Sequence, residues 1–243
     1  MKIKETVIDF AKLSQEEKHQ QFQKIWEFDQ RIFPGGTIEQ LYDYLYDLAA
    51  VSIPIVQYFH RGKLVGQNII PILKLKAAKR DIFIITSRAG FLTEYRGRNR
   101  SLNSAIRVAL NHRIRYPATP LWFVTTLMQP KIYRLFASRS ANFFPRAGRA
   151  MPKAHAEVLQ IMQSYCTDVQ VRGENIFVHR CNIPKVTAEQ LVRLRNRSDS
   201  HNQYFLQHVP DYFDGMGLMC ICCLDFSTIF ETIFNLAMGR TVK

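Results

Sequence analysis

The stretch Phe91-Leu92-Thr93-Glu94-Tyr95-Arg96-Gly97-Arg98-Asn99-Arg100-Ser101 decides how this chain is interpreted. It joins an apolar run at 81–92, which predicts a buried strand, to a helical stripe of apolar residues at 102–114. Three arginines at alternate positions flank Gly97 just before the helix. A helix N-terminus offers unpaired N–H groups and the positive end of the helix dipole, and arginine adds forked donors. The stretch therefore predicts a turn that binds a pyrophosphate, with a solvated basic loop as the alternative.

Charge supports an anionic ligand. The 243 residues include 33 Lys or Arg and 20 Asp or Glu, which gives a net charge of +13. Residues 61–115 alone carry a net charge of +11. Such a surface attracts nucleic acid, an anionic membrane or a phosphorylated small ligand. The 47% hydrophobic content excludes a wholly disordered chain.

The order of predicted elements indicates an α/β fold. Capping boxes at Ser14–Glu17, Thr37–Gln40 and Thr187–Gln190 predict three helix starts. Gly90 suggests a bulge in its strand. Strands are predicted at 52–59, 64–75, 81–92, 121–128, 175–182 and 217–224, and further helices near 102–114, 131–139, 153–165 and 226–238. The first two strands, joined by a turn at 60–63, form a hairpin.

On these residues the chain resembles the GNAT superfamily of N-acyltransferases, whose acyl-CoA motif is Arg/Gln-x-x-Gly-x-Gly/Ala between a strand and a helix. Glu94-Tyr95-Arg96-Gly97 match the family pattern directly, and Phe91 takes the place of its valine. Asn99 and Ser101 stand where the family has small residues, Gly and then Gly or Ala. Asparagine tolerates a glycine-like φ, so the turn survives the change. The resemblance covers about 22–144 and includes the hairpin that ends in Leu64-Val65-Gly66.

The resemblance implies a mixed, mostly antiparallel central sheet of about six to seven strands flanked by helices. It implies a single domain over 1–243, with a core at about 14–145 and the segment 150–243 completing the sheet. The one weak candidate for a linker is 146–152. The cosubstrate implied is acyl-CoA, carrying an acetyl or short acyl group. The residues expected to contact it are Phe91, Leu92, Thr93, Arg96, Gly97, Arg98, Asn99, Arg100 and Ser101.

Catalysis in this family is direct attack of an amine on the thioester, often with a tyrosine that protonates the leaving thiolate. Phe136 occupies the place of that tyrosine, and Tyr133 lies three residues earlier on nearly the same helix face. Tyr133 is therefore a candidate general acid, with a packing role as the alternative. The general base stays open among Glu94, His179 and Asp211.

The cysteines point to core packing. Cys220, Cys222 and Cys223 lie on an apolar strand without metal-ligand spacing, so we expect no metal. An odd cysteine count and a start without an apolar leader segment predict a reducing, cytoplasmic location. The uncharged run at 215–224 that contains these cysteines is too short to span a membrane.

Three functions remain open from the sequence. The first is an acyl-CoA-dependent N-acyltransferase acting on a small-molecule or protein amine that the sequence does not identify. The second is a basic nucleic-acid-binding protein in which Phe91, Tyr95 and Tyr116 stack on bases, although no known nucleic-acid-binding pattern is present. The third is a catalytically silent GNAT-like interaction protein. The apolar stripe of the last helix fits core packing or a homodimer contact.

Overall fold

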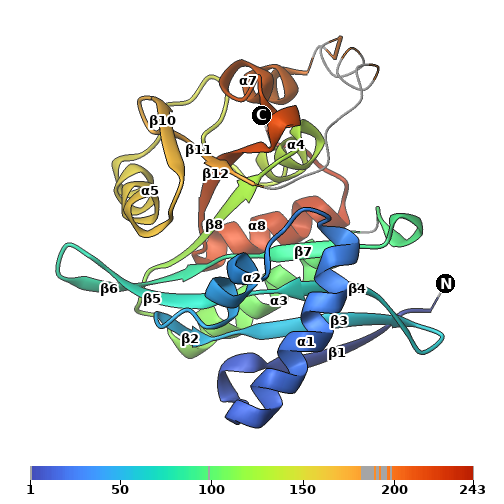
Figure 1. Cartoon of the computed structure of the whole chain (residues 1–243). Coiled ribbons are helices and arrows are strands. Elements are labelled where there is room, and N and C mark those ends of the chain that lie inside the picture. The colour runs from blue at the N-terminus through green and yellow to red at the C-terminus, as the bar shows by residue number, and fades with distance from the viewer. Residues whose placement is uncertain are drawn as a thin grey trace. The chain divides into compact units, whose positions relative to one another are not determined.

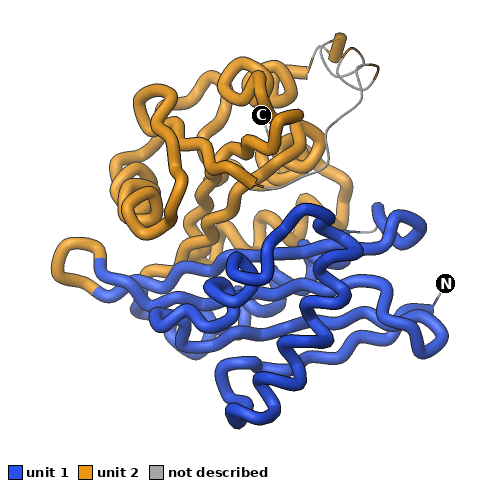
Figure 2. Tube along the Cα trace, in the orientation of Figure 1, with its two compact units in different colours: residues 1–76, 81–119 blue, residues 77–80, 120–243 orange. Residues whose placement is uncertain are grey.

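The structure is a computed structural model that describes residues 2–97, 99–181, 189, 192, 196–197 and 199–242 (Figure 1). The chain divides into two compact units. Unit 1 comprises Met1–Lys76 and Asp81–Thr119, and unit 2 comprises Ala77–Arg80 and Pro120–Lys243 (Figure 2). The candidate linker at 146–152 lies inside unit 2.

Unit 1 mixes helices with antiparallel strands. Its helices are α1 (Gln15–Ile32), α2 (Ile38–Leu45) and α3 (Arg100–Arg115), with 3₁₀ turns at Phe10–Lys12 and Thr93–Tyr95. Its strands are β1 (Lys4–Asp9), β2 (Ala50–Ser52), β3 (Pro54–His60), β4 (Lys63–Ile69), β5 (Ile72–Ala77), β6 (Arg80–Ile85) and β7 (Arg88–Phe91). Strands β1-β3-β4-β7 form an antiparallel sheet in that order, and β6-β5-β2 lie side by side.

Both predicted capping boxes in unit 1 are confirmed. The Ser14 hydroxyl accepts from the Glu17 N–H at 3.3 Å, and the Glu17 carboxylate accepts from the Ser14 N–H at 2.8 Å. Thr37 and Gln40 make the same reciprocal pair at the start of α2. The third box, at 187–190, lies mostly outside the described residues. These caps satisfy backbone donors that a helix start otherwise leaves unpaired.

Helices α1 and α3 lie on opposite faces of the four-stranded sheet. The Gln67 side chain donates to the Ile25 carbonyl of α1, whereas the Asn68 side chain donates to the Ser101 carbonyl of α3. Successive side chains of a strand point to opposite faces. Strand β4 is therefore held between the two helices, and so is β7, its neighbour in the sheet.

Two runs predicted as single strands each divide in two. The run at 64–75 is interrupted at Ile70-Pro71, between β4 and β5, and the run at 81–92 is interrupted at Thr86-Ser87, between β6 and β7. The two interruptions meet, because the Thr86 N–H donates to the Pro71 carbonyl at 3.1 Å. The chain thus passes from the four-stranded sheet to the β6-β5-β2 strands at Ile70-Pro71 and returns at Thr86-Ser87. The two crossings lie side by side.

The bulge predicted at Gly90 is wrong. Strands β4 and β7 keep an uninterrupted register in which Gln67 faces Gly90. A Cβ atom on Gly90 would lie 2.6 Å from the Ile32 side chain of α1. Glycine is required there because the helix approaches the strand closely.

The apolar core of unit 1 is formed mainly by residues of α1, α2, β3 and β4. Strand β1, which was not predicted from the sequence, adds the partly buried Ile8 to it. The buried cluster comprises Phe10, Phe22, Ile25, Leu41, Leu45, Ile53, Ile55 and Ile69, and Trp26 of α1 packs against it. Strand β1 carries exposed charged residues and pairs with β3 at the edge of the sheet. Charged side chains are common on edge strands, which is why the apolar alternation is weak there.

Unit 2 contains a second antiparallel arrangement. Its helices are α4 (Pro130–Ala137), α5 (Lys153–Tyr165), α7 (Ser200–His208) and α8 (Phe226–Ala237). Its strands are β8 (Leu121–Leu127), β9 (Phe143–Phe144), β10 (Val169–Gly173), β11 (Ile176–Arg180) and β12 (Met216–Cys223). Strands β10-β11-β12-β8 are adjacent in that order, and β9 also pairs with β12. Trp122 is buried in β8, with its ring 4.9 Å from the ring of His155.

The predicted mixed α/β class with mostly antiparallel pairing is confirmed. Strands in the described residues outnumber the six or seven expected. The difference arises because β1, β2, β9 and β10 were not expected and because two predicted strands each divide in two.

Candidate functional site

The predicted ligand-binding turn follows the C-terminal end of β7. Phe91 ends this strand directly opposite Gly66 of β4, and its ring rests on the glycine. A Cβ atom on Gly66 would lie 2.2 Å from that ring, so only glycine fits. The Tyr58 ring lies 4.7 Å from the Phe91 ring, measured between centroids. Phe91 is thereby fixed in place where the turn begins.

The turn itself is built on two left-handed backbone positions. Gly97 has a φ of 96°, and Asn99 has a φ of 51° and caps the N-terminus of α3. The expectation that asparagine takes up a glycine-like φ at this place is confirmed. Arg98, between them, lies outside the described residues. Two left-handed residues turn the chain sharply from the strand into the helix.

The N-terminus of α3 leaves donors available to a ligand. The Asn99 side chain makes no capping hydrogen bond, and the first turn of α3 contains no acidic residue. The helix begins at Arg100, two residues before the apolar stripe predicted at 102–114. Within the described part of the chain, the buried Nη1 of Arg100 has no hydrogen-bond partner. A buried guanidinium nitrogen without a described partner, beside the N–H groups of a helix start, fits an anionic group such as a diphosphate.

Polar groups of β3 and β4 hold this helix start in position. The Tyr58 hydroxyl donates to the Arg100 carbonyl at 3.1 Å, and the Asn68 side chain donates to the Ser101 carbonyl at 3.0 Å. Burial raises the pKa of Tyr58 to about 12, so its hydroxyl stays protonated and able to donate. Neither residue is among those predicted from the sequence. The available signal was a polar side chain within an otherwise apolar strand.

Arg96 uses one of its N–H donors inside the turn. Its Nε donates to the Phe91 carbonyl at 3.0 Å, which closes the turn on itself. Leu92 belongs to the strand end, since its N–H donates to the Val65 carbonyl at 3.0 Å. Thr93 is exposed in the 3₁₀ turn. Among these three residues, the guanidinium of Arg96 retains further donors that can face a ligand.

One backbone edge of β7 is not used by β4. In an antiparallel pair, hydrogen-bonded and non-hydrogen-bonded positions alternate. The bond between Leu92 and Val65 sets that alternation, so the backbone N–H and C=O of Ala89 point away from β4. Among the strands that the structure describes, β7 has β4 as its single neighbour in the four-stranded sheet. A ligand chain running from the turn along β7 would meet these groups.

Tyr133, the candidate general acid, lies on α4 of unit 2. Its side chain is fully buried, and its hydroxyl donates to the Pro145 carbonyl at 2.8 Å. Burial raises the pKa of Tyr133 well above its ordinary value. These contacts describe a packed, hydrogen-bonded tyrosine, and its catalytic role stays a prediction.

The three candidate bases have distinct surroundings. Glu94 is exposed in the 3₁₀ turn that precedes the binding turn. His179 lies on β11, and burial lowers its pKa. Both oxygens of Asp211 accept from Arg172, which lowers the pKa of that carboxyl group. Asp211 is thus engaged in an ion pair.

Cys220 and Cys222 lie inside the sheet of unit 2. Both are buried on β12, and burial raises the pKa of Cys222 to about 12. A thiol with such a pKa is protonated at neutral pH and is a weak nucleophile. The described residues contain no group of three or more His, Cys, Asp or Glu side chains that could hold a metal ion. No helix in the described part of the chain is long and apolar enough to cross a membrane.

Comparison with known proteins gives structural similarity at low identity. No family model and no curated protein sequence matches the chain. A conserved protein of unknown function from Enterococcus faecalis, described as a probable N-acyltransferase, has a TM-score of 0.39 at 10% identity. That match covers 58% of this chain and 33% of the other, so the chain spans about a third of its length.

Two further solved structures are similar at the same level. An acyl-CoA N-acyltransferase from Pseudomonas aeruginosa has a TM-score of 0.34 at 14% identity, covering 56% of this chain and 85% of that one. A ribosomal-protein-alanine N-acetyltransferase from Brucella melitensis has a TM-score of 0.31 at 14% identity, covering 51% and 79%. All three are described as N-acyltransferases or N-acetyltransferases. TM-scores this low do not transfer an activity to this chain.

Proposed function

We propose that this protein is an acyl-CoA-dependent N-acyltransferase that transfers an acetyl or short acyl group to an amine. The observation that carries the proposal is the unit formed by β7, the turn and α3. Gly97 and Asn99 bend the chain so that a helix start without an acidic residue follows a strand with an unused backbone edge. That arrangement suits a ligand with a diphosphate at one end and a chain of amide groups at the other.

In this proposal the turn binds the diphosphate. The backbone N–H groups of Gly97, Asn99 and Ser101 donate to its oxygens, and the Arg100 guanidinium supplies the positive charge nearby. Arg96 maintains the closed shape of the turn through its bond to the Phe91 carbonyl. The predicted contact set from Phe91 to Ser101 is retained, with Arg98 as the member outside the described residues.

The remaining chemistry depends on positioning. Acyl-CoA supplies an activated thioester. The Ala89 N–H on the unused edge of β7 can donate to a carbonyl of the ligand beside it. The amine forms the new C–N bond while the C–S bond breaks, the amine loses a proton, and the leaving thiolate takes one up.

Calorimetric titration with acetyl-CoA, paired with thermal melting, tests the proposal. A ligand that binds only the folded state stabilises it, by about 2.7 kcal/mol at a hundred times its Kd. We expect saturable heat and a raised melting temperature. Folded protein that shows neither at millimolar acetyl-CoA would overturn the acyltransferase proposal.

Two further readouts separate the alternatives. Release of free CoA in the presence of a panel of amines identifies an active enzyme, whereas acetyl-CoA binding without release identifies a silent fold. Binding of RNA or DNA that weakens steeply with salt, without acetyl-CoA binding, would favour the nucleic-acid hypothesis. A cytoplasmic location is also part of the proposal. Within the described residues no disulfide joins any of the five cysteines, which are Cys166, Cys181, Cys220, Cys222 and Cys223.

A further inference from the structure

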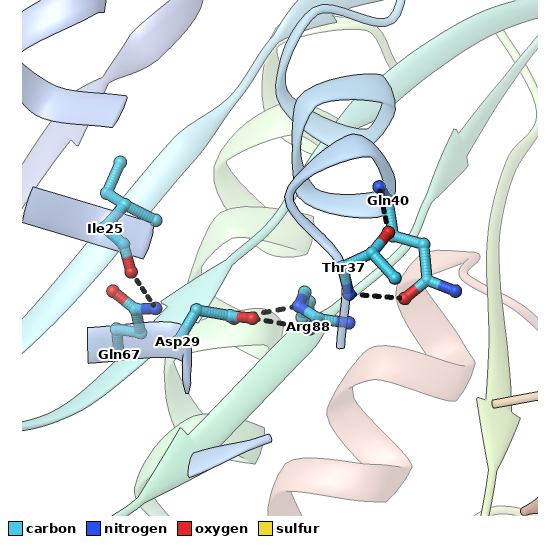
Figure 3. A network of polar contacts seen from close by, with 6 residues as sticks. All are labelled: Ile25, Asp29, Thr37, Gln40, Gln67 and Arg88. Atoms are coloured by element: carbon cyan, nitrogen blue, oxygen red, sulfur yellow. Dashed lines mark hydrogen bonds and ion pairs between the residues drawn. The ribbon is translucent and has the colours of Figure 1, made fainter. Parts of the chain in front are cut away.

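An ion pair inside unit 1 uses one edge of its arginine side chain. Arg88, at the start of β7, donates from Nε to one oxygen of Asp29 at 2.9 Å and from Nη2 to the other at 2.6 Å (Figure 3). Asp29 lies on α1 and is fully buried. The Arg88 side chain is 24% exposed. The pair therefore joins a buried carboxylate to a guanidinium that reaches the surface.

Asp29 occupies one edge of the guanidinium. Arginine carries five N–H donors, and this pairing uses the one on Nε and one of the two on Nη2. The remaining edge, made by Nη1 and the second N–H of Nη2, has the spacing that matches both oxygens of another carboxylate. No described residue accepts a hydrogen bond from Nη1 of Arg88.

The surroundings fix the guanidinium in one orientation. Its central carbon lies 4.4 Å from the centre of the Phe33 ring, within the range of a cation–π contact. At Gly36, in the turn between α1 and α2, an added Cβ atom would lie 3.2 Å from Nη2. Because ring, carboxylate and turn hold it from several sides, little side-chain entropy remains to be lost on binding a ligand.

Arg88 also stands on the strand that leads from the proposed diphosphate turn. It lies three residues before Phe91 on β7, a distance of about 10 Å along an extended strand. The unused backbone edge at Ala89 is adjacent. An acyl-CoA chain that starts at the turn and runs along β7 would bring its reactive end toward Arg88.

A gain in stability does not by itself account for the Asp29–Arg88 ion pair. Burying two charges carries a desolvation cost, and a well-packed apolar pair of similar volume is often as stable or more so. A partly exposed arginine fixed by a buried carboxylate resembles instead a prearranged recognition group.

We propose that the free edge of Arg88 binds the carboxylate of the acceptor, so that the acceptor is an amine that also carries a carboxylate group. This inference rests on the proposed acyltransferase function. A carboxylate suits the position better than a phosphate dianion, because Asp29 already neutralises the charge of Arg88 and the flat fork matches two oxygens in a plane. Asp29 is then a positioning residue that acts through Arg88.

The test uses matched acceptors with and without the carboxylate. L-amino acids and their carboxamides are compared in pairs, both for binding by ligand-observed NMR and for kcat/KM from CoA release with acetyl-CoA. We expect the wild-type protein to prefer the carboxylate member by about ten- to a hundred-fold, as for one charge-assisted contact. In the double variant Asp29→Asn with Arg88→Gln, which keeps neutral polar groups of similar size, that preference should disappear.

Controls separate recognition from folding. Lys74→Gln removes a cation of unit 1 from its exposed pair with Asp81 and should leave the preference unchanged. A merely structural role would lower binding of both members of each acceptor pair equally. Equal affinity of the wild-type protein for both members, or a preference that survives in the double variant, overturns the inference.

Failure of the proposed function gives a different pattern. If acetyl-CoA does not bind, the acyltransferase proposal fails. If the NMR preference for carboxylates is nevertheless present and is lost in the double variant, the Arg88 site stands by itself. If acetyl-CoA binds and the NMR preference is absent, the acyltransferase proposal stands and the Arg88 inference fails.

Discussion

At the scale of single residues, Gly66 controls the position of Phe91 and hence of the binding turn. Gly66→Ala would place a Cβ atom 2.2 Å from the Phe91 ring. The ring must move, and overpacking of this kind typically costs about 1–3 kcal/mol. We expect a lower free energy of unfolding in urea and weaker acetyl-CoA binding.

Gly173→Ala is the matched control for Gly66→Ala. Gly173 is also a strand residue, at the end of β10, and a Cβ atom there would meet Ile176 at an ordinary 3.7 Å. We expect a change of less than about 1 kcal/mol, of either sign. Equal effects at the two glycines would mean that the Phe91 ring yields without consequence for the turn.

Tyr133→Phe tests the predicted general acid. Its buried hydroxyl bonds the Pro145 carbonyl, so removing the hydroxyl should lower the free energy of unfolding by about 1 kcal/mol. A general acid would in addition lower kcat while acetyl-CoA affinity stays the same. An unchanged kcat per folded molecule would leave Tyr133 with its packing role.

Single residues also show which features of the site could be predicted from the sequence. Asn99 could be predicted to take up a left-handed φ because asparagine is the residue that tolerates it best after glycine. The bracing roles of Tyr58 and Asn68 could not be predicted, since they depend on which face of each strand meets α3. The Asp29–Arg88 pair joins residues 59 positions apart, and no local pattern indicates it.

At the scale of elements, the start of α3 depends on the backbone at Asn99. Asn99→Gly keeps access to a φ near 51° and should retain acetyl-CoA binding. Asn99→Val, a β-branched residue, is strained there by at least about 1–2 kcal/mol. We expect it to lower acetyl-CoA affinity about ten-fold, measured by calorimetry. Comparable affinity in both variants would show that the turn does not form the binding site.

The elements that the sequence revealed are those with strong local signals. Capping boxes placed α1 and α2 correctly because the reciprocal hydrogen bonds are local. The divisions of 64–75 and 81–92 were missed because they result from a bond between distant residues, Thr86 and Pro71. Strand β10 carries mostly exposed or partly exposed residues, so its apolar alternation gives little signal.

At the scale of the whole molecule, acidification should reduce stability. The pKa of His112 is lowered to about 4 by burial first, and then by Arg115 and Arg113. The unfolded chain binds this proton near pH 6.5, so between about pH 6.5 and pH 4 the unfolded state holds more protons. The free energy of unfolding should therefore fall as pH drops through this window, by about 3 kcal/mol at most from this group. Above pH 6.5 this group should add no pH dependence to the free energy of unfolding.

His112→Gln measures that contribution by difference. The variant should show a shallower pH dependence of unfolding between pH 6.5 and 4 than the wild-type protein. His19→Gln, at an exposed site on α1, serves as the control for replacing a histidine by glutamine. Burial also lowers the pKa of His155, His179, His201 and His208, so some slope should persist in the His112 variant.

The division into two units gives each unit its own intrinsic fluorophore. The chain has two tryptophans, Trp26 in α1 of unit 1 and Trp122 in β8 of unit 2. Trp26→Phe and Trp122→Phe therefore leave emission from one unit at a time, and urea titrations followed by the wavelength of that emission report each unit separately. Coincident midpoints would mean that the chain melts cooperatively as one domain, and separated midpoints would mean that either unit can open while the other stays folded.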